Sequence, residues 1–240
     1  MAIKGVFFDL GGTLFTYRNV PRQHGELLGA TADRLGLGDA RALKKAYVDA
    51  MRAQTEIYAA RDYYLHRDLF RDAFVDSLRR VGHEPNESLI DWYLEAHRDS
   101  VFGCLEIKPD CVETLAALRD RGLYLSIVSN IDDDMLHPLV TREGLERYLH
   151  HWTSSEEAQS CKPHRAFFES CLRKSGLAAE DILFVGDSPE HDIEGAGALG
   201  MQTALITDEG MPPPLQSGKA TPEPDHRIDR LTQLISLLAA

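Results

Sequence analysis

The sequence predicts an α/β fold, in which a Rossmann-like parallel sheet core carries helices on both faces and an all-helical domain is inserted into it. Three observations support this class. After residue 106, short and nearly continuous apolar runs alternate with helical patterns, which is typical of parallel strands buried on both faces. One similar run stands near the N-terminus, before a long stretch of helical periodicity alone. The 240 residues are 43% hydrophobic and 27% charged, as in ordinary globular proteins.

The first predicted strand is Gly5-Val-Phe-Phe8, and the segment that follows it shows only helical rhythm, over residues 20–101. One helix is expected where apolar side chains recur at i, i+3 and i+4 and form one buried face: Leu43, Ala46, Tyr47, Ala50, Met51, Ile57 and Tyr58. A second helix ends before Gly82, and a third begins after Asn86, which is a good N-cap. These patterns predict an inserted all-helical domain over residues 16–105.

The second half of the chain alternates between the two patterns. A helix is expected after Pro109, and further helices near residues 165–174 and 193–199. Between them lie three apolar runs of strand length, at residues 123–128, 182–185 and 203–206. The α/β core domain is therefore predicted from residues 1–15 and 106–240. The segment 210–224 contains five prolines and predicts a surface loop.

Charge and cysteine content limit the class of protein. The net charge of −12 disfavours binding to nucleic acid or to an anionic membrane, which needs clustered Lys and Arg. The four cysteines show neither a CxxC pair nor zinc-site spacing, so we expect reduced thiols that are buried or partly buried. No apolar run reaches the roughly 20 residues that span a bilayer, and the apolar N-terminal segment is too short for a signal peptide. We expect a cytoplasmic protein, of undefined oligomeric state.

Polar clusters follow the predicted strands. Asp9-Leu-Gly-Gly-Thr13 follows the first, Ser129-Asn130 the second, and Gly186-Asp187-Ser188 the third, while Cys161-Lys162-Pro163 precedes a helix. Taken singly, each cluster is more often a helix cap, a turn or a solvated surface residue. Ligands of an open parallel sheet bind beyond the carboxyl ends of its strands, so the four clusters together predict one site.

The carboxylates of this predicted site point to a metal. Asp9, Asp187 and Asp192 would repel one another unless a hard cation lay between them, and Mg²⁺ accepts such oxygen ligands. A carboxylate can also act as a nucleophile and form an aspartyl-phosphate.

The remaining groups suit a phosphoryl substrate. The Ser129 hydroxyl, the Lys162 ammonium and the amides after Asp9 can neutralise phosphoryl oxygens. Gly11 and Gly12 allow the backbone to approach a phosphate closely.

Four segments of the chain, FFDLGGTL, IVSN, CKP and GDSPEHDIEGA, resemble in order the four motifs of the haloacid dehalogenase (HAD) superfamily. The helical insertion between the first two is similar to the C1-type cap of subfamily I. The resemblance implies a Mg²⁺-dependent hydrolase, in particular a phosphomonoester phosphatase acting on a small phosphorylated substrate through an aspartyl-phosphate on Asp9.

The resemblance also implies a role for each motif residue. Asp9 would be the nucleophile, and Lys162 would balance its charge and that of the phosphoryl group. Mg²⁺ would be held by Asp9, the Gly11 carbonyl, Asp187 and Asp192. Phosphate would be bound by Ser129, Asn130, Lys162, Gly12 and Thr13.

Gly11 departs from the family pattern. Phosphatases of the family usually carry a second Asp at this position, which protonates the leaving group, and such assistance is worth about 10²–10⁴ in rate. Three interpretations stay open. The substrate has a good leaving group; or the cap supplies the acid, from His24, Tyr63, Tyr64 or His66; or the protein is a weakly active or non-catalytic member that binds a phosphorylated metabolite. We expect Gly11→Asp to speed the hydrolysis of alkyl phosphates.

Two other branches of the family are minor alternatives. Haloacid dehalogenases resemble D-x-Y-G-T at the first motif and need no metal, whereas this chain has Gly11 and keeps the acidic fourth motif. Phosphonate-cleaving members use a cap lysine, and the cap lysines here, Lys44 and Lys45, are predicted on a solvated helix face.

The segment from Arg61 to Arg67 lies between two predicted helices and mixes aromatic, basic and imidazole groups. We hypothesise that Arg61, Tyr64 and Arg67 help to select the substrate, because loops often carry function. The alternative is a plain surface connection between helices.

Overall fold

The computed structural model describes residues 2–207, 213, 216 and 218–239. The chain divides into two compact units, each treated by itself: a core unit of residues 1–17 and 106–240, and a helical unit of residues 18–105. Of the predicted loop at 210–224, residues 210–212, 214–215 and 217 lie outside the described residues, and 218–224 contain neither helix nor strand.

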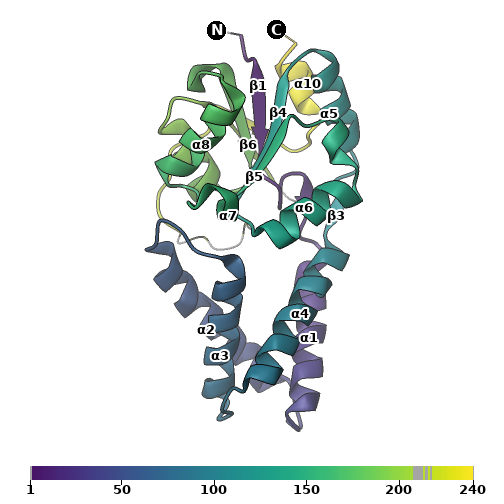
Figure 1. Ribbon diagram of the computed structural model, residues 1–240, viewed down its shortest axis with the longest axis vertical. Coiled ribbons are helices and arrows are strands. Elements are labelled where there is room, and N and C mark those ends of the chain that lie inside the picture. The colour runs from purple at the N-terminus through teal and green to yellow at the C-terminus, as the bar shows by residue number, and fades with distance from the viewer. Residues whose placement is uncertain (1, 208–212, 214–215, 217, 240) are drawn as a thin grey trace. The chain divides into compact units, whose positions relative to one another are not determined.

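A six-stranded parallel sheet forms the centre of the core unit, which confirms the predicted α/β class (Figure 1). Its strand order is β5-β4-β1-β6-β7-β8. The strands are β1 (Gly5–Phe8), β4 (Tyr124–Ser129), β5 (His151–Ser154), β6 (Ile182–Gly186), β7 (Gln202–Ile206) and β8 (His226–Ile228). The apolar runs predicted β1, β4, β6 and β7, whereas the edge strands β5 and β8 are short and carry polar residues, so they show no such run.

Helices cover both faces of this sheet. Figure 1 shows α8 on one side and α5 with α10 on the other. The helices are α5 (Cys111–Asp120), α6 (Asp133–Arg142), α7 (Ser155–Ala158), α8 (Arg165–Ser175), α9 (Glu194–Gly197) and α10 (Gln233–Leu237). Short turns of helix are η1 (Leu145–Arg147), η2 (Ala179–Asp181) and η3 (Pro189–Ile193), the last a π-helix. The helix predicted near 193–199 thus begins earlier, because the Ser188 hydroxyl accepts a hydrogen bond from the His191 amide and starts η3 there.

A small antiparallel ribbon of the core unit pairs the segment before residue 18 with the segment after residue 105. It consists of β2 (Phe15–Thr16) and β3 (Glu106–Ile107), with Phe15 opposite Ile107. The Lys108 amide extends the pairing by donating to the Leu14 carbonyl at 2.8 Å. The ribbon fixes the chain that follows the first polar cluster.

The helical unit contains α1 (Val20–Arg34), α2 (Arg41–Ala59), α3 (His66–Arg80) and α4 (Glu87–Cys104). The Asn86 side chain accepts a hydrogen bond from the Leu89 amide at 2.9 Å, as expected of the predicted N-cap. Lys44 and Lys45 are exposed, as predicted. Ile57 was wrongly assigned to the buried face of α2: it is 52% exposed, because the last turn buries the neighbouring Tyr58 instead.

His24 and His97 are neighbouring, partly buried residues of the helical unit. His24 Nε2 is hydrogen-bonded to Tyr93 Oη at 3.0 Å, and its ring centroid lies 4.4 Å from that of Tyr47. The His97 ring lies 4.5 Å from Phe70 and 5.6 Å from His24. His24, which was one candidate for a catalytic acid, therefore packs as an interior residue of the helical unit.

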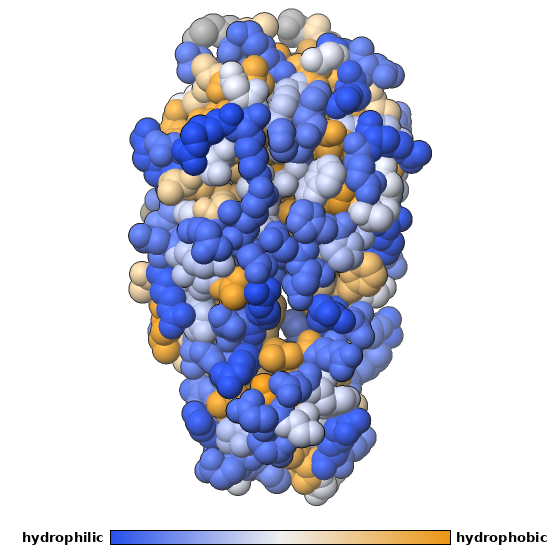
Figure 2. Space-filling model, viewed as in Figure 1, coloured by the Kyte–Doolittle hydropathy of each residue, from blue (hydrophilic) through white to orange (hydrophobic). Residues whose placement is uncertain are grey.

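The visible face of each unit is mainly hydrophilic, with apolar side chains scattered over it (Figure 2). All four cysteines are buried, as predicted, and none forms a disulfide. Among the described residues, no helix is both long and apolar enough to cross a membrane.

Candidate active site

Asp9 directly follows β1, which lies between β4 and β6 in the middle of the sheet. Its amide donates to the Val185 carbonyl at 2.9 Å, so the end of β1 is still attached to β6 at this point. The Asp9 side chain is buried at the carboxyl edge of the sheet. This is the place where a parallel sheet gathers the residues that follow its strands.

Three other polar clusters meet Asp9 there. Asp9 Oδ1 accepts hydrogen bonds from Ser129 Oγ at 2.9 Å and from Lys162 Nζ at 2.7 Å. The same ammonium donates to Asp192 Oδ1 at 2.6 Å, and the Lys162 and Asp192 side chains are only 2% and 1% exposed. The ammonium therefore links two carboxylates in the interior of the core unit.

Asn130 holds the backbone of Lys162. Its Nδ2 donates to the Lys162 carbonyl at 2.9 Å, and its Oδ1 accepts from the Lys162 amide at 2.7 Å. Both ends of the side-chain amide are thus engaged by one residue. Asn130 therefore contacts the backbone of Lys162, and its expected part in binding phosphate stays a prediction.

The three predicted metal-binding carboxylates lie together. Asp9, Asp187 and Asp192 are all buried, and one oxygen from each lies within 4.8 Å of the others. The Ser188 amide donates to Asp192 Oδ2 at 3.0 Å. Asp187 Oδ2 is buried and has no hydrogen-bond partner among the described residues.

The electrostatics of the site follow from this crowding. Burial raises the pKa of Asp187 well above its ordinary value, and the charges of Asp9 and Asp192 raise it further. Burial also raises the pKa of Asp192 to about 6, although Lys162 opposes the rise. For Lys162, burial disfavours the charged form, but the charges of Asp192 and Asp9 outweigh it and raise its pKa.

The residues present therefore fit a divalent cation. Among the described residues, three carboxylates face one fully buried ammonium, which leaves negative charge uncompensated, and one buried oxygen of Asp187 has no hydrogen-bond partner. An all-oxygen donor set of this kind suits Mg²⁺.

Two glycines allow the carboxylates to come this close. A Cβ on Gly12, which has φ = +74°, would overlap the Asp187 carboxylate, and a Cβ on Gly186 would overlap that of Asp192. The neighbouring Thr13 is fully buried, and within the described part of the chain its hydroxyl has no hydrogen-bond partner.

Sequence reasoning missed two polar side chains beside Gly11 and Gly12. Lys108 Nζ donates to the Gly12 carbonyl at 2.5 Å, and its positive charge opposes the rise in the pKa of Asp187. Tyr17 places its hydroxyl against Gly11. Each residue directly follows a strand of the β2–β3 ribbon, and these two-residue strands are too short to produce a recognisable sequence pattern.

The three residues predicted to select substrate belong to the helical unit. The Arg61 guanidinium lies 4.0 Å above the Tyr58 ring, and the Tyr64 ring packs edge-on against the same ring at 5.2 Å. The Tyr58 hydroxyl in turn donates to Asp72 Oδ2 at 2.7 Å. Arg67 lies in the first turn of α3. A role for these side chains in substrate choice stays a prediction.

The family model for haloacid dehalogenase-like hydrolases matches residues 3–200. The chain belongs to this family. It is a hydrolase of the haloacid dehalogenase type, as the four motifs indicated.

Relatives of two kinds match the chain over nearly its whole length. A phosphoglycolate phosphatase of Pectobacterium atrosepticum is 30% identical, over 99% of this chain and 93% of the relative. A glyceraldehyde 3-phosphate phosphatase of Methanopyrus kandleri is 27% identical, over 98% and 97%. The (S)-2-haloacid dehalogenase 4A of Burkholderia cepacia is 25% identical, over 99% and 96%.

Solved structures agree with this assignment. An L-2-haloacid dehalogenase is 26% identical over 100% of both chains, with a TM-score of 0.71. A putative HAD-hydrolase of Bacillus subtilis, bound to magnesium, is 17% identical over 100% of both chains, with a TM-score of 0.77, and supports the fold alone.

Proposed function

We propose that this hydrolase is a Mg²⁺-dependent phosphomonoester phosphatase with Asp9 as its nucleophile. The observation that carries the proposal is the buried cluster in which Ser129 and Lys162 both donate hydrogen bonds to Asp9 Oδ1 while one oxygen each of Asp9, Asp187 and Asp192 lies within 4.8 Å of the others. An ammonium and a hydroxyl beside a carboxylate suit a phosphoryl group, and the surplus carboxylates suit its metal.

The reaction has two steps. An Asp9 carboxylate oxygen attacks phosphorus, so an O–P bond forms to Asp9 and the ester P–O bond breaks; the leaving oxygen keeps the electron pair and takes a proton from water. A second water then attacks phosphorus, breaks the bond to Asp9, and releases inorganic phosphate and a proton. Lys162 and Ser129 hold the phosphoryl oxygens throughout, and Asn130 fixes Lys162.

Asp9, Asp187, Asp192 and the Gly11 carbonyl would hold Mg²⁺ at this site. When bound, the ion supplies positive charge to the phosphoryl oxygens. Gly12 contributes by leaving room for the Asp187 carboxylate.

The substrate is proposed to be a small phosphorylated metabolite, as the names of the phosphatase relatives suggest. Arg61, Tyr64 and Arg67 are proposed to influence its choice. The four buried thiols favour a reducing compartment, and we propose a cytoplasmic location.

The test is p-nitrophenyl phosphate hydrolysis by the full chain with Mg²⁺ and with EDTA. We expect release in Mg²⁺, loss in EDTA, and a loss of at least about 10³-fold in Asp9→Asn, because an amide is a poor nucleophile. Asp120→Asn, at an exposed position on α5, is the matched control and should be unaffected. Activity that survives Asp9→Asn, or no release from a broad panel of phosphate esters, would overturn the proposal. Binding of phosphate esters without any release would indicate a non-catalytic member.

Dehalogenation is a second candidate, because whole-length relatives carry that name. The Asp9 carboxylate would then displace halide from carbon, with the halide leaving with the bonding pair, and water would hydrolyse the resulting ester. Halide release from 2-chloropropionate that persists in EDTA would favour this reaction over phosphate hydrolysis.

A further inference from the structure

Tyr17 fills the space beside Gly11. An ideal Cβ built on Gly11 would overlap the Tyr17 hydroxyl and lie 2.5 Å from Cζ and 3.0 Å from Cε1 of the same ring. Real side chains do not approach so closely, so no residue larger than glycine fits at position 11 while Tyr17 stays in place. Gly11 is buried, whereas Tyr17 is partly exposed.

The two glycines after Asp9 therefore face different partners. Gly12 faces the Asp187 carboxylate, on the side where the metal would bind, and Gly11 faces the Tyr17 phenol. A carboxylate at neutral pH only accepts hydrogen bonds, whereas a phenol can donate one. The Tyr17 hydroxyl is thus a donor beside the nucleophile segment, at the position where most phosphatases of the family would carry a second carboxyl group.

We propose that Tyr17 sets the substrate class by donating a hydrogen bond to the leaving oxygen of the phosphate ester. This inference rests on the proposed phosphatase function. In an in-line displacement, the attacking and leaving oxygens lie on opposite sides of phosphorus. Ser129 and Lys162 donate hydrogen bonds to Asp9 Oδ1, the attacking group. Tyr17 directly follows β2, further along the chain from Asp9.

A donor in this position stabilises developing negative charge without giving up its proton. The leaving oxygen takes its proton from water, and the phenol stays intact. Such help is sufficient when the leaving group is itself a stable anion, so the substrates favoured are aryl, enol or acyl phosphates rather than simple alkyl phosphates.

The contact changes the expectation for Gly11→Asp. The new side chain would have to displace the Tyr17 ring. By itself the substitution should therefore slow the reaction, contrary to the sequence-based expectation. Faster hydrolysis of alkyl phosphates should need Gly11→Asp together with Tyr17→Ala.

The experiment measures kcat/KM for phenyl phosphates of graded leaving-group acidity and for one alkyl phosphate. Tyr17→Phe keeps the ring and removes the hydroxyl. We expect a loss below about 5-fold with p-nitrophenyl phosphate and of about 100-fold with the alkyl ester, the range for removing one donor from a developing oxyanion. Tyr148→Phe, on a partly exposed tyrosine of the core unit, is the matched control and should change neither.

A second variant tests the contact itself. Gly11→Ala should push the phenol aside and reproduce the selective loss, and Gly11→Ala with Tyr17→Phe should lose no more than Gly11→Ala alone. This non-additivity provides a check that does not depend on the folding of Tyr17→Phe alone.

The outcomes separate the two proposals. An active wild type whose Tyr17→Phe loss is absent, or equal across leaving groups, overturns the role of Tyr17 and leaves the phosphatase proposal standing. A wild type that releases no phosphate, or whose release survives Asp9→Asn, overturns the phosphatase proposal and the role of Tyr17 with it.

Discussion

Both units bury titratable side chains, but with opposite results. In the core unit, the charges of Asp192 and Asp9 outweigh the cost of burial and keep Lys162 protonated. In the helical unit, burial lowers the pKa of His24 to about 4 and that of His97 to about 3. The rings that face these histidines belong to Tyr47, Tyr93 and Phe70, and a neutral phenol or phenyl ring does not stabilise an imidazolium as a carboxylate does.

The difference shows how a candidate active site is distinguished from a hydrophobic core. A buried charge persists only where a partner of opposite sign offsets the loss of hydration. The core unit supplies such partners from four separate segments, at a place where chemistry is proposed. The helical unit supplies aromatic rings, so His24 and His97 stay neutral and act as packing residues.

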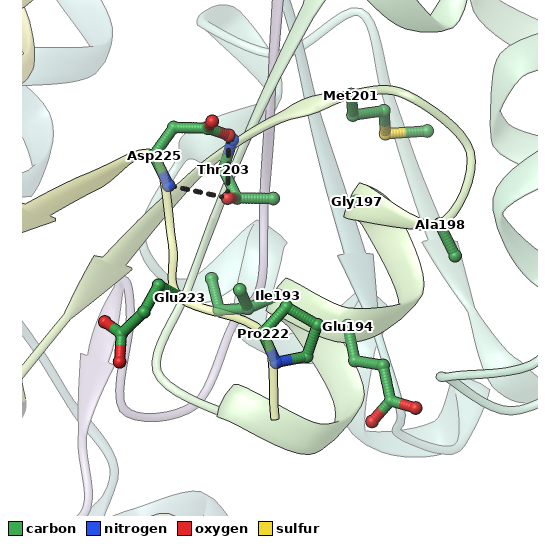
Figure 3. A pocket seen from close by; sticks show the side chains of 9 residues that line it. All are labelled: Ile193, Glu194, Gly197, Ala198, Met201, Thr203, Pro222, Glu223 and Asp225. Carbon is green, nitrogen blue, oxygen red and sulfur yellow. Dashed lines mark hydrogen bonds between the residues drawn. The ribbon is translucent and has the colours of Figure 1, made fainter. Parts of the chain in front are cut away.

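The pocket in Figure 3 offers another contrast within the core unit. It has a volume of about 380 Å³ and is lined by residues of η3, α9, β7 and the segment before β8, among them Glu194, Glu223 and Asp225. Asp225 accepts hydrogen bonds from the Thr203 amide and hydroxyl, at 2.8 and 3.0 Å. Asp225 thus ties the segment before β8 to β7, whereas the carboxylates of Asp9, Asp187 and Asp192 lie close to one another.

The largest effect is expected from Lys162→Met. Without the ammonium, Asp9 and Asp192 lose their shared buried partner, so unfolding free energy should fall by about 3–5 kcal/mol and turnover should be abolished. Urea titration and a phosphate-release assay measure the two effects. Lys45→Met, which breaks an exposed pair with Asp49, should leave the free energy of unfolding almost unchanged, because solvent screens this pair. Equal stabilities of the two variants would show that the buried ammonium does not offset charge as described.

Gly12→Ala should disturb the site without changing any charge. The new methyl group would overlap the Asp187 carboxylate, so we expect Mg²⁺-dependent kcat/KM to fall by about 100-fold. Gly122→Ala is a matched control in the same unit, since Gly122 also has a positive φ, of +78°, but nothing lies within 4 Å of its added Cβ. Its effect should be limited to the backbone cost of about 1 kcal/mol. Equal activity losses would contradict the role given to Gly12.

The helical unit should respond to acid through its histidines. A histidine whose pKa is 6.5 when unfolded and about 3 when folded binds protons more readily in the unfolded state, so stability is lost as pH falls below 6.5. His97→Phe should remove part of this loss, on the order of 2 kcal/mol between pH 7 and pH 4. Urea titrations of both proteins across this range provide the measurement. If the free energies of unfolding of the two proteins changed in parallel with pH, this would contradict the conclusion that His97 is neutral in the folded state. The metal-free Asp192, with its raised pKa, contributes with the opposite sign as pH falls through 6, and this contribution cancels in the comparison.

The smallest effect is expected from Asn86→Ala, which removes the side-chain cap of α4. Unfolding free energy should fall by about 1 kcal/mol, as for other N-caps, while Asn86→Asp should keep most of it. Thermal melting of the three proteins tests this. A loss of unfolding free energy as large as that of Lys162→Met would contradict the expectation that a helix cap contributes less to stability than a buried charge pair.

Much of the fold could be predicted because its signals are local. Apolar runs of four to six residues predicted β1, β4, β6 and β7, and the N-cap at Asn86 could be predicted from its residue type alone. The prediction that Ile57 is buried was wrong because a helical period alone does not decide which of two adjacent apolar residues the last turn buries. The edge strands β5 and β8 were not predicted because their side chains are too polar to form an apolar run.

The sequence by itself determined the strands β1, β4, β6 and β7 and the convergence of Asp9, Ser129 and Asp187, because parallel strands bring the residues that follow them to one edge, and its motifs added Lys162 to this group. Only the tertiary structure decided that Tyr17 lies on Gly11, that Lys108 bonds the Gly12 carbonyl and that Asn130 clamps the Lys162 backbone. The physical reason is the separation in sequence. The apolar pattern of a strand is a property of consecutive residues, whereas the contact of a long side chain with a distant loop depends on how the whole backbone folds.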